Sequence, residues 1–480
     1  MKRRLLILIV VASVLAPDRG RCAESQPSEK PMNILFLIID DLNTWLLSKE
    51  GRYEGNVVAP HIRKLADSGI NFTNAYCSSP KCSPSRTSFL SGVAPWKSGH
   101  TNNGLDIKKN EVLAQAIAFP KLLQQNGYVI GSAGKVGHGY DFDYESDIPR
   151  GEGAGRRPPF PPDAPLKGFG KKNEYDWGPI HIPESEMGDT KVADFAIRAL
   201  EMDHEKPFFI AAGLFCPHMP WYVPQKYFDM NPLEEIDLPP LKEGDLDDVP
   251  AAGKDLVSSF YQSALKAGKY KEGVQGYLAG TSYSDFQMGR ILDTLEKSKY
   301  RDNTIVILFS DHGFHVGEKG HWQKGTLWED GSNTLLTIRV PGMTQAGQVC
   351  ERPVSLLDLY PTLMELAGIE APAYLDGQSL VPLLKDVTAP REQPALTVYD
   401  THIAVRTQQH RLIRYGDGSM ELYDHAQDPN EWKNLANDPA YTDVRDQLAA
   451  LLPTPEEMAP MAPGKVRGKG KSSKSKKDKS

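Results

Sequence analysis

The sequence is poor in cysteine and poor in basic residues outside its last segment. Only 5 of its 480 residues are cysteines. Apart from Cys22 and Cys82, the three remaining cysteines are an odd number, which excludes complete pairing within one chain and leaves any disulfide open; they are Cys77, Cys216 and Cys350. The formal net charge is −7, and residues 464–480 hold eight Lys and Arg and one Asp, so the rest of the chain carries −14. An acidic body of this kind argues against nucleic-acid binding by the folded part.

Long apolar runs are also scarce. The charged stretch from Met1 to Arg4 precedes an apolar run from Leu5 to Leu15, and this order is typical of a secretory signal peptide. The run is too short for a good membrane span. We therefore expect a signal peptide over residues 1–23 and no integral membrane segment after its cleavage. The mature protein would be periplasmic or secreted.

Apolar runs typical of buried strands alternate with helical patterns along most of the chain. The strands are predicted at residues 33–39, 128–133, 208–214, 304–309 and 335–340. Helices are predicted at residues 111–126 and 272–298, among others. This alternation predicts an α/β fold with a large, mostly parallel sheet sandwiched by helices.

The pattern changes near residue 386 to short alternating segments. These segments, at residues 404–407, 411–415 and 420–423, predict a small antiparallel sheet. We therefore expect a large α/β domain over residues 24–385 and a smaller α+β subdomain over residues 386–455. A Lys-rich tail over residues 456–480 is expected to be disordered.

Four of the predicted buried strands are followed directly by polar, reactive residues. In an open parallel sheet, ligands bind beyond the carboxyl ends of the strands, so these residues should converge on one crevice. They are Asp40 and Asp41, Lys135 and His138, His218, and Asp311 and His312.

The segment Cys82-Ser83-Pro84-Ser85-Arg86 is unusual for an ordinary loop. Because proline fits the first helical turn, we expect a helix to begin just after Pro84. Cys82 would then lie at a helix N-terminus, where unpaired N–H groups favour an anion, and Arg86 would add a positive charge. Such surroundings lower the pKa of a thiol. The alternative is a buried structural cysteine in a turn.

The carboxylates of Asp40, Asp41 and Asp311 are suited to a hard divalent cation such as Ca²⁺, which takes mostly oxygen ligands. His312 could add a nitrogen ligand or donate a hydrogen bond to a substrate. The alternative for each acidic pair alone is a helix cap after a strand. Taken alone, His138 or His218 would more often be structural than catalytic, Lys135 in a Gly-rich turn would more often be solvated, and Lys324 is ambiguous.

Taken together, these motifs resemble those of type I, formylglycine-dependent sulfatases of the alkaline phosphatase superfamily, and most closely the iduronate-2-sulfatase group. The resemblance covers roughly residues 32–440. It is carried by Cys82-Ser83-Pro84-Ser85-Arg86, Asp40-Asp41, Gly134-Lys135-Val136-Gly137-His138, Pro217-His218-Met219-Pro220, Ser310-Asp311-His312-Gly313 with Gly317-Glu318, and Lys324. The chain departs from the family pattern at Val93, where an arginine is usual.

The resemblance implies that a maturation enzyme oxidises Cys82 to formylglycine, whose hydrated gem-diol attacks the sulfur of a sulfate ester and later expels sulfate. It also implies one Ca²⁺ ion, bound by Asp40, Asp41, Cys82, Asp311 and His312. Arg86 and Lys135 would hold the formylglycine oxygens, and His138 would assist the gem-diol as a base. His218 and Lys324 would bind the sulfate and protonate or stabilise the leaving oxygen.

The implied substrate is a sulfated sugar, derived from a glycosaminoglycan-like or other polysaccharide and cleaved from a chain end. Side chains that could contact the sugar are Trp221, Tyr222, His100, His315 and His321, each equally suited to packing. Two alternatives remain. The first is a phosphate- or phosphonate-ester hydrolase on the same fold, and the second is a non-catalytic polysaccharide-binding protein with an unconverted Cys82.

Overall fold

The computed structural model describes residues 31–47, 52–104, 106–138, 146–155, 176–454 and 456–459. The described residues from Met32 onward belong to one compact unit. The predicted signal peptide and all but residues 456–459 of the predicted tail lie outside the described residues. The boundary near residue 386 stays a prediction. No helix in the described ranges is both long and apolar enough to cross a bilayer.

A seven-stranded sheet forms the centre of the fold, in the order β12-β2-β11-β8-β1-β6-β4. The four strands β8, β1, β6 and β4 are adjacent and parallel, whereas β11 runs antiparallel to β8 and to β2. The bounds are β1 Asn33–Ile39, β2 Ile70–Phe72, β4 Val129–Gly134, β6 Phe208–Leu214, β8 Thr304–Ser310, β11 Leu336–Arg339 and β12 Gln348–Cys350. The predicted mostly parallel sheet is confirmed.

Strand β1 explains why the sheet has a hydrophobic core on each face. Its seven residues are all buried, and successive side chains point to opposite faces. Leu35 and Leu37 pack in the core that includes residues of α5 and α9. Ile34 and Phe36 pack in the other core, with residues of α2, α4 and α11. A continuous apolar run is what a strand covered on both faces requires.

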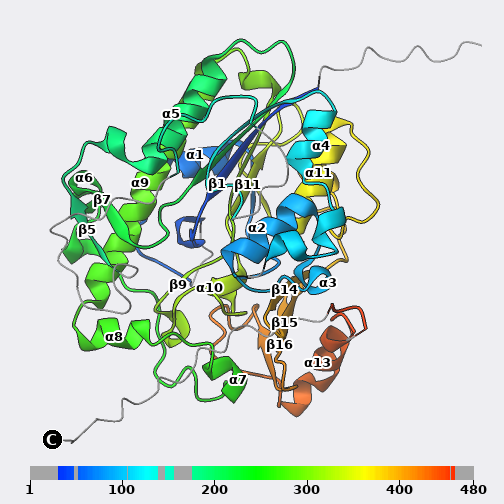
Figure 1. Cartoon of the computed structure of the whole chain (residues 1–480). Helices are drawn as coiled ribbons and strands as arrows, with labels where there is room; N and C mark the ends of the chain where they lie inside the picture. Colours follow the sequence, from blue (N-terminus) through cyan, green and yellow to red (C-terminus); the bar gives the residue numbers. More distant parts are fainter. Residues whose placement is uncertain are drawn as a thin grey trace, which may run out of the picture. The chain divides into compact units, whose positions relative to one another are not determined.

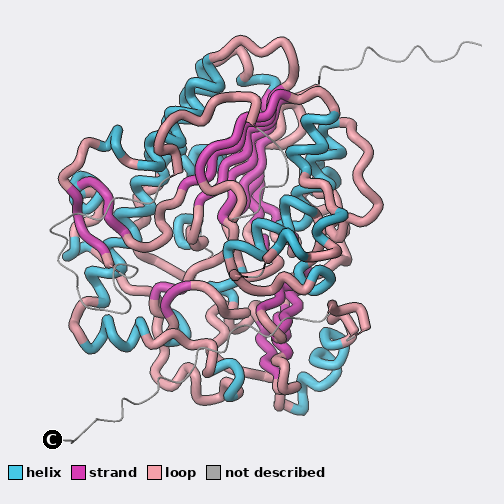
Figure 2. The backbone as a smooth tube through the Cα atoms, in the orientation of Figure 1, coloured by secondary structure: helices cyan, strands magenta, loops and turns pink. Residues whose placement is uncertain are grey.

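Helices cover both faces of the sheet (Figures 1 and 2). On one face lie α1, α5 and α9, and on the other α2, α4 and α11. Their bounds are α1 Pro60–Ser68, α2 Cys82–Ser91, α4 Phe119–Gln125, α5 Gly188–Glu201, α9 Tyr270–Lys297 and α11 Leu359–Ala367. The helix predicted over 272–298 is confirmed to within two residues.

The helix predicted over residues 111–126 is wrong in its first half. Only α4, Phe119–Gln125, is α-helical there, and Leu113–Gln115 form a single 3-10 turn. Pro120 lies at the second position of α4. Ala118, which precedes α4, has an extended backbone with ψ 141°. Proline is accepted only in the first turn of a helix, so the helix must begin next to it.

The predicted small antiparallel sheet is confirmed as four strands in the order β14-β15-β16-β17. They are β14 Ala395–Tyr399, β15 His402–Arg406, β16 His410–Arg414 and β17 Met420–Asp424. Strand β14 is joined to the segment that precedes Cys82, because Thr397 Oγ1 donates to the Cys77 carbonyl at 2.7 Å and Val398 N donates to Ser78 O at 2.9 Å. The second sheet thus supports the loop that leads into α2.

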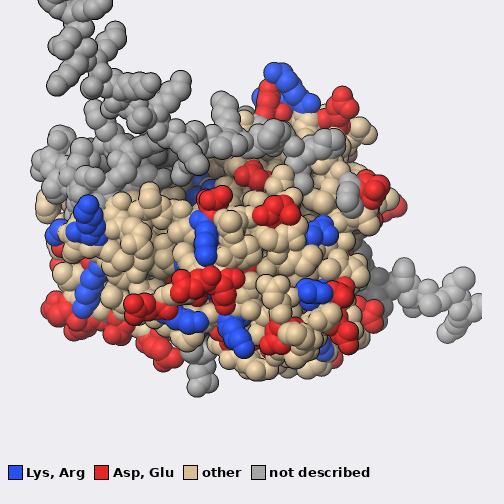
Figure 3. Space-filling view, turned by 90° about the horizontal axis from the view of Figure 1, so that it is seen from below, with Lys and Arg blue, Asp and Glu red and all other residues tan. Residues whose placement is uncertain are grey.

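The described surface carries charges of both signs. On the face in Figure 3, acidic side chains gather in several groups, with Lys and Arg side chains between them. Among the cysteines, Cys77, Cys216 and Cys350 are buried free thiols. The face in Figure 3 therefore carries charges of both signs, with acidic groups prominent among them.

Candidate active site

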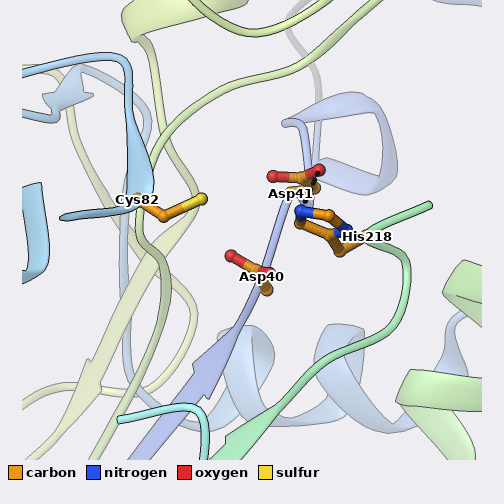
Figure 4. A group of neighbouring side chains, drawn as sticks. All are labelled: Asp40, Asp41, Cys82 and His218. Atoms are coloured by element: carbon orange, nitrogen blue, oxygen red, sulfur yellow. Dashed lines mark ion pairs between the residues drawn. The ribbon is translucent and has the colours of Figure 1, made fainter. Parts of the chain in front are cut away.

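The strand ends converge as predicted. Asp40 and Asp41 follow β1, Lys135 follows β4, and Asp311 follows β8, three strands of one parallel set. His218 lies four residues after β6, in the loop to β7 (Trp221–Pro224). Figure 4 shows the side chains of Asp40, Asp41 and His218 directed toward that of Cys82, which comes from α2. The parallel strands therefore bring these groups to one edge of the sheet.

Cys82 is the first residue of α2, so the prediction that this helix begins just after Pro84 is wrong by three residues. Pro84 occupies the third helical position, and the first intrahelical bond runs from Ser85 N to Lys81 O at 3.0 Å. The first N–H groups of a helix have no intrahelical acceptor, so a proline in that turn removes no hydrogen bond. Cys82 still lies at the helix N-terminus, as predicted.

The Cys82 thiol faces a strongly positive environment. Burial acts to raise its pKa, but the charges of Lys135 and Lys324 outweigh burial and hold the pKa well below its ordinary value. Its Sγ lies 3.3 Å from Nε2 of His312. These neighbours would equally stabilise a negatively charged oxygen in place of the sulfur, and they distinguish Cys82 from an inert core cysteine.

Arg86 ties two of the predicted ligands together. Its side chain is fully buried, with Nη2 donating to Asp40 Oδ1 at 3.0 Å and Nε donating to Asp311 Oδ2 at 2.9 Å. Nη1 donates to the backbone carbonyls of Lys135 and Val136. One guanidinium therefore fixes the ends of β1, β8 and β4 relative to each other, which only the planar fork of arginine allows.

Each of the two carboxylates that follow β1 pairs with a lysine. Lys135 Nζ pairs with Asp40, and Lys324 Nζ lies 2.5 Å from Asp41 Oδ1. Burial acts to raise the pKa of Asp40, but Lys135 and Arg86 outweigh it and hold that pKa well below its ordinary value. Burial raises the pKa of Asp41 to about 7, although Lys324 opposes the shift. The cluster thus contains buried carboxylates whose charge is not fully compensated.

The two predicted histidines nearest Asp41 both direct Nε2 into the cluster. Nδ1 of His312 lies 2.9 Å from the Gly313 carbonyl, and Nδ1 of His218 lies 2.7 Å from the Met219 carbonyl. A carbonyl only accepts, so Nδ1 carries the proton in each ring. Nε2 of His312 lies 3.5 Å from Asp41 Oδ1, and Nε2 of His218 lies 3.9 Å from Asp41 Oδ2. A neutral ring in this tautomer presents its Nε2 lone pair to the cluster.

His138 is the one predicted site residue that does not join this network. It is half-buried, and among the described residues no hydrogen bond or ion pair links it to the cluster. Burial lowers the pKa of His100 to about 4, with a smaller contribution from the neighbouring His138. His100 Nε2 lies 2.9 Å from Ser83 Oγ, next to Cys82 in sequence. His138 therefore lies close enough to His100 to affect its pKa.

The donor set fits a divalent cation. Ligand atoms of Asp40, Cys82, Asp311 and His312 lie within 4.8 Å of one another, as do those of Asp40, Asp41, Cys82 and His218. Ligands about 2.3–2.6 Å from a Ca²⁺ ion lie no more than about twice that distance apart. Burial raises the pKa of Asp311, and an added positive charge would relieve this cost of burying carboxylates.

Asp189 supports the His218 loop, and sequence reasoning does not single it out. This buried side chain, in the first turn of α5, accepts hydrogen bonds at 2.8 Å from the backbone N–H groups of Phe215 and Cys216. Burial raises its pKa to about 7. An acidic residue in the first turn is common in helices of every kind. From sequence alone, Asp189 would therefore be interpreted as an ordinary helix-capping residue.

The aromatic residues considered for sugar stacking are in the core. Trp221 is 0% and Tyr222 is 1% exposed, so neither ring presents a face to a ligand. Trp221 packs edge-on against Tyr277 at 5.4 Å. His315 and His321 are also buried and lie against each other at 5.0 Å. Their aromatic character serves packing, which is the alternative that their sequence context left open.

Comparisons with known proteins agree with this geometry. A family model described as "Sulfatase" matches residues 32–369, and one described as "N-sulphoglucosamine sulphohydrolase, C-terminal" matches residues 317–457. A protein named sulfatase from Formosa agariphila is 35% identical and covers 94% of this chain and 92% of its own length. Iduronate 2-sulfatase of Homo sapiens is 28% identical, over 77% of this chain and 75% of that protein.

A solved structure supports the same conclusion. It is described as a complex with its substrate D-glucosamine-2-N,6-O-disulfate, and it shares 25% sequence identity and a TM-score of 0.69 with this chain. The match covers 88% of this chain and 97% of that one. The resemblance found in the motifs is confirmed, and the chain belongs to the sulfatase family of sulfuric ester hydrolases.

Proposed function

We propose that the protein hydrolyses a sulfate ester of a sulfated sugar, with Cys82 converted to formylglycine and one Ca²⁺ ion at the carboxylate cluster. One observation carries the proposal. The Sγ atom of Cys82, at a helix N-terminus, lies within 4.8 Å of ligand atoms of Asp40, Asp41 and His218. The buried Arg86 guanidinium and the largely buried ammonium groups of Lys135 and Lys324 pair with Asp40 and Asp41 in the same cluster. A sulfate ester needs this combination of a nucleophile and fixed positive charge.

The proposed ligands of the cation are Asp40, Asp41, Cys82, Asp311 and His312. Ca²⁺ would supply Lewis-acid polarisation of the oxygens bound to it, and formylglycine would supply a gem-diol oxygen as the nucleophile. His312 Nε2, at 3.3 Å from the Cys82 side-chain atom, can hold a proton or a metal there. Arg86 and Lys135 hold Asp40 in place and add positive charge beside position 82.

Lys324 and His218 would face the sulfate on the Asp41 side. Burial acts to lower the pKa of Lys324, but the negative charges of Asp41 and Cys82 outweigh it and raise that pKa, so Lys324 stays charged. This fixed charge would bind sulfate and stabilise the leaving oxygen. His218, whose Nε2 points at Asp41, would bind the same group and assist the leaving oxygen. His138 would act as a base.

The substrate that we propose is a glycosaminoglycan-like or other polysaccharide fragment, cleaved at a chain end. Support comes from the names of relatives, which include an iduronate 2-sulfatase, and from the solved relative bound to a disulfated glucosamine. The proposal also includes export to the periplasm or the medium and a maturation enzyme that oxidises Cys82. Export rests on the charged and apolar pattern of residues 1–23.

The experiment supplies purified protein, co-expressed with a maturation enzyme, with Ca²⁺ and a panel of sulfated mono- and oligosaccharides, iduronate-containing ones included. Ion chromatography follows free sulfate and free phosphate, with Cys82→Ala as the control. We expect sulfate release that disappears in the variant, and faster release from short oligosaccharides than from intact polymer. Phosphate release from phosphate esters without sulfate release would support the first alternative. Binding of polysaccharide without any hydrolysis would support the second.

A further inference from the structure

The hydroxyl group of Tyr277 spans the turn that carries the Asp41 carboxylate. Tyr277 lies on α9, and its side chain is 1% exposed. Its hydroxyl accepts a hydrogen bond from Asn43 N at 2.7 Å and donates one to Asp41 O at 3.0 Å. A single side-chain atom therefore bonds to the backbone two residues apart, on both sides of Leu42.

This turn needs such a partner because its backbone is unusual. Asp41 has φ 63°, in the left-handed region that side-chain-bearing residues rarely adopt. Asp41 is 1% and Asn43 is 4% exposed, so water does not serve their backbone groups. A buried N–H or C=O without a partner is costly, and the hydroxyl satisfies one of each.

Packing against Phe314 and Trp45 holds the Tyr277 ring with its hydroxyl at the Asp41 turn. The ring stacks on Phe314 with 5.5 Å between ring centres and an interplanar angle of 7°. Trp45 packs edge-on against it at 5.7 Å. The Asn43 side chain accepts from Trp45 N at 3.2 Å and donates to Phe314 O at 3.4 Å. The turn at Asp41 is thus linked to the rings of Trp45 and Phe314 both through Asn43 and through Tyr277.

We infer that Tyr277 is a positioning residue, whose hydroxyl holds the Asp41 turn in the conformation that directs the carboxylate at the cation. The inference rests on the proposed function, because it takes Asp41 as a ligand of Ca²⁺. Removing the hydroxyl leaves the ring packing in place but frees the turn to relax. Loss of a group that orients a ligand typically weakens metal binding about 10- to 100-fold.

The test compares Tyr277→Phe with Tyr283→Phe. Tyr283 lies on the same helix, is 0% exposed, and its hydroxyl makes two hydrogen bonds, to Thr190 N at 3.1 Å and Thr190 Oγ1 at 2.9 Å. Each substitution deletes one buried hydroxyl with two partners. Of the two tyrosines, Tyr277 bonds to the Asp41 turn and Tyr283 does not. Comparison of the two variants therefore separates an effect on cation binding from an effect on stability.

Calcium affinity is measured by titration calorimetry on the full chain, and thermal stability by calorimetry without calcium. We expect similar losses of stability in both variants, with a Ca²⁺ Kd raised about 10-fold or more only in Tyr277→Phe. Hydrogen exchange of the Asn43 amide should also quicken in that variant and slow again when Ca²⁺ is added. The kcat of Tyr277→Phe should be closer to the wild-type value at saturating Ca²⁺ than at lower Ca²⁺ concentrations.

Two results would overturn the inference in distinguishable ways. If wild type binds Ca²⁺ and Tyr277→Phe binds it with the same Kd, the hydroxyl does not position Asp41, and the proposed function stands. If wild type itself binds no Ca²⁺, the proposed metal is wrong, and the role of Tyr277 falls with it.

Discussion

The Sγ atom of Cys82 lies 3.3 Å from Nε2 of His312, across 230 residues of sequence. The His312 ring is turned this way because its Nδ1 bonds to the Gly313 carbonyl. Burial acts to lower the pKa of His312, but Asp311 and Cys82 outweigh it and raise that pKa. The side chain at position 82 therefore meets a group that can bear a proton or a metal.

The first prediction concerns the buried guanidinium of Arg86. In Arg86→Ala, Asp40 and Asp311 lose a shared partner, and leaving buried charge unpaired typically costs about 3–5 kcal/mol. We expect a lower Tm and a fall in kcat/KM of about 10²-fold or more. Calorimetry and sulfate release measure the two effects. A variant with wild-type kcat/KM would show that Arg86 does not organise the site.

Arg391 offers a matched control for that substitution. It pairs with Asp358 at 2.7 Å, and the two side chains are 4% and 0% exposed. Arg391→Ala should lose stability for the same physical reason. Its kcat/KM below the new Tm should stay near the wild-type value, because this pair lies outside the cation cluster.

The second prediction is a pH dependence of stability that comes from Asp189. Burial raises the pKa of this carboxyl to about 7 in the folded protein, from an ordinary value of 3.8. The folded state therefore keeps a proton that the unfolded chain releases, and this contribution to stability is full below pH 3.8 and is lost as pH rises through 7. The free energy of unfolding of wild type relative to Asp189→Asn should fall over this range.

Denaturant titrations of both proteins between pH 4 and pH 8 measure that difference. Asp194→Asn on the same helix is the control, since Asp194 is a partly exposed residue that pairs with Arg290. A constant difference between wild type and Asp189→Asn across the pH range would mean that Asp189 does not titrate there.

The third prediction concerns metal removal. Because Asp40, Asp41 and Asp311 are buried together, Ca²⁺ should stabilise the folded protein. Sulfate release should also require the ion. Ca²⁺ at 100 times its Kd adds about 2.7 kcal/mol to the free energy of unfolding. A chelator should lower the Tm and abolish sulfate release, and Ca²⁺ should restore both. Mg²⁺ should restore less, because it demands a regular octahedral shell.

The fourth prediction concerns Val93, where the family usually has arginine. Val93 is 6% exposed and packs with Ile107 and Leu113. Arginine there would bury a charge without a partner, so Val93→Arg should lower the Tm. If Val93 limits maturation, the fraction of formylglycine at position 82 should rise in the same variant. An unchanged fraction, measured by mass spectrometry, would mean that Val93 does not limit conversion.

The strands and their ends could be predicted because each leaves a strong local signal. A fully buried parallel strand must be a continuous apolar run, and β1 and β6 have the predicted bounds. The polar groups that follow β1, β4, β6 and β8 could be placed together because parallel strands end at one edge. Family motifs then added Lys324, whose loop carries no signal of its own.

What escaped prediction depends on contacts between distant segments. Helical periodicity predicts that Tyr277 lies on a helix, but it does not show that the Tyr277 hydroxyl reaches the Asp41 turn. Asp189 looks like a helix cap, and its bonds to Phe215 and Cys216 exist only in the fold. The start of α2 was misplaced because a proline in the first turn is compatible with more than one helix start.

The most direct test of the central claim is a mass measurement on the peptide that contains Cys82, made on the same samples as the sulfate assay. Preparations that differ in the amount of maturation enzyme should contain different fractions of formylglycine. The account predicts that sulfate release rises in proportion to this fraction and is absent from unconverted protein. Full sulfate release by protein with an unmodified Cys82 thiol would contradict the account.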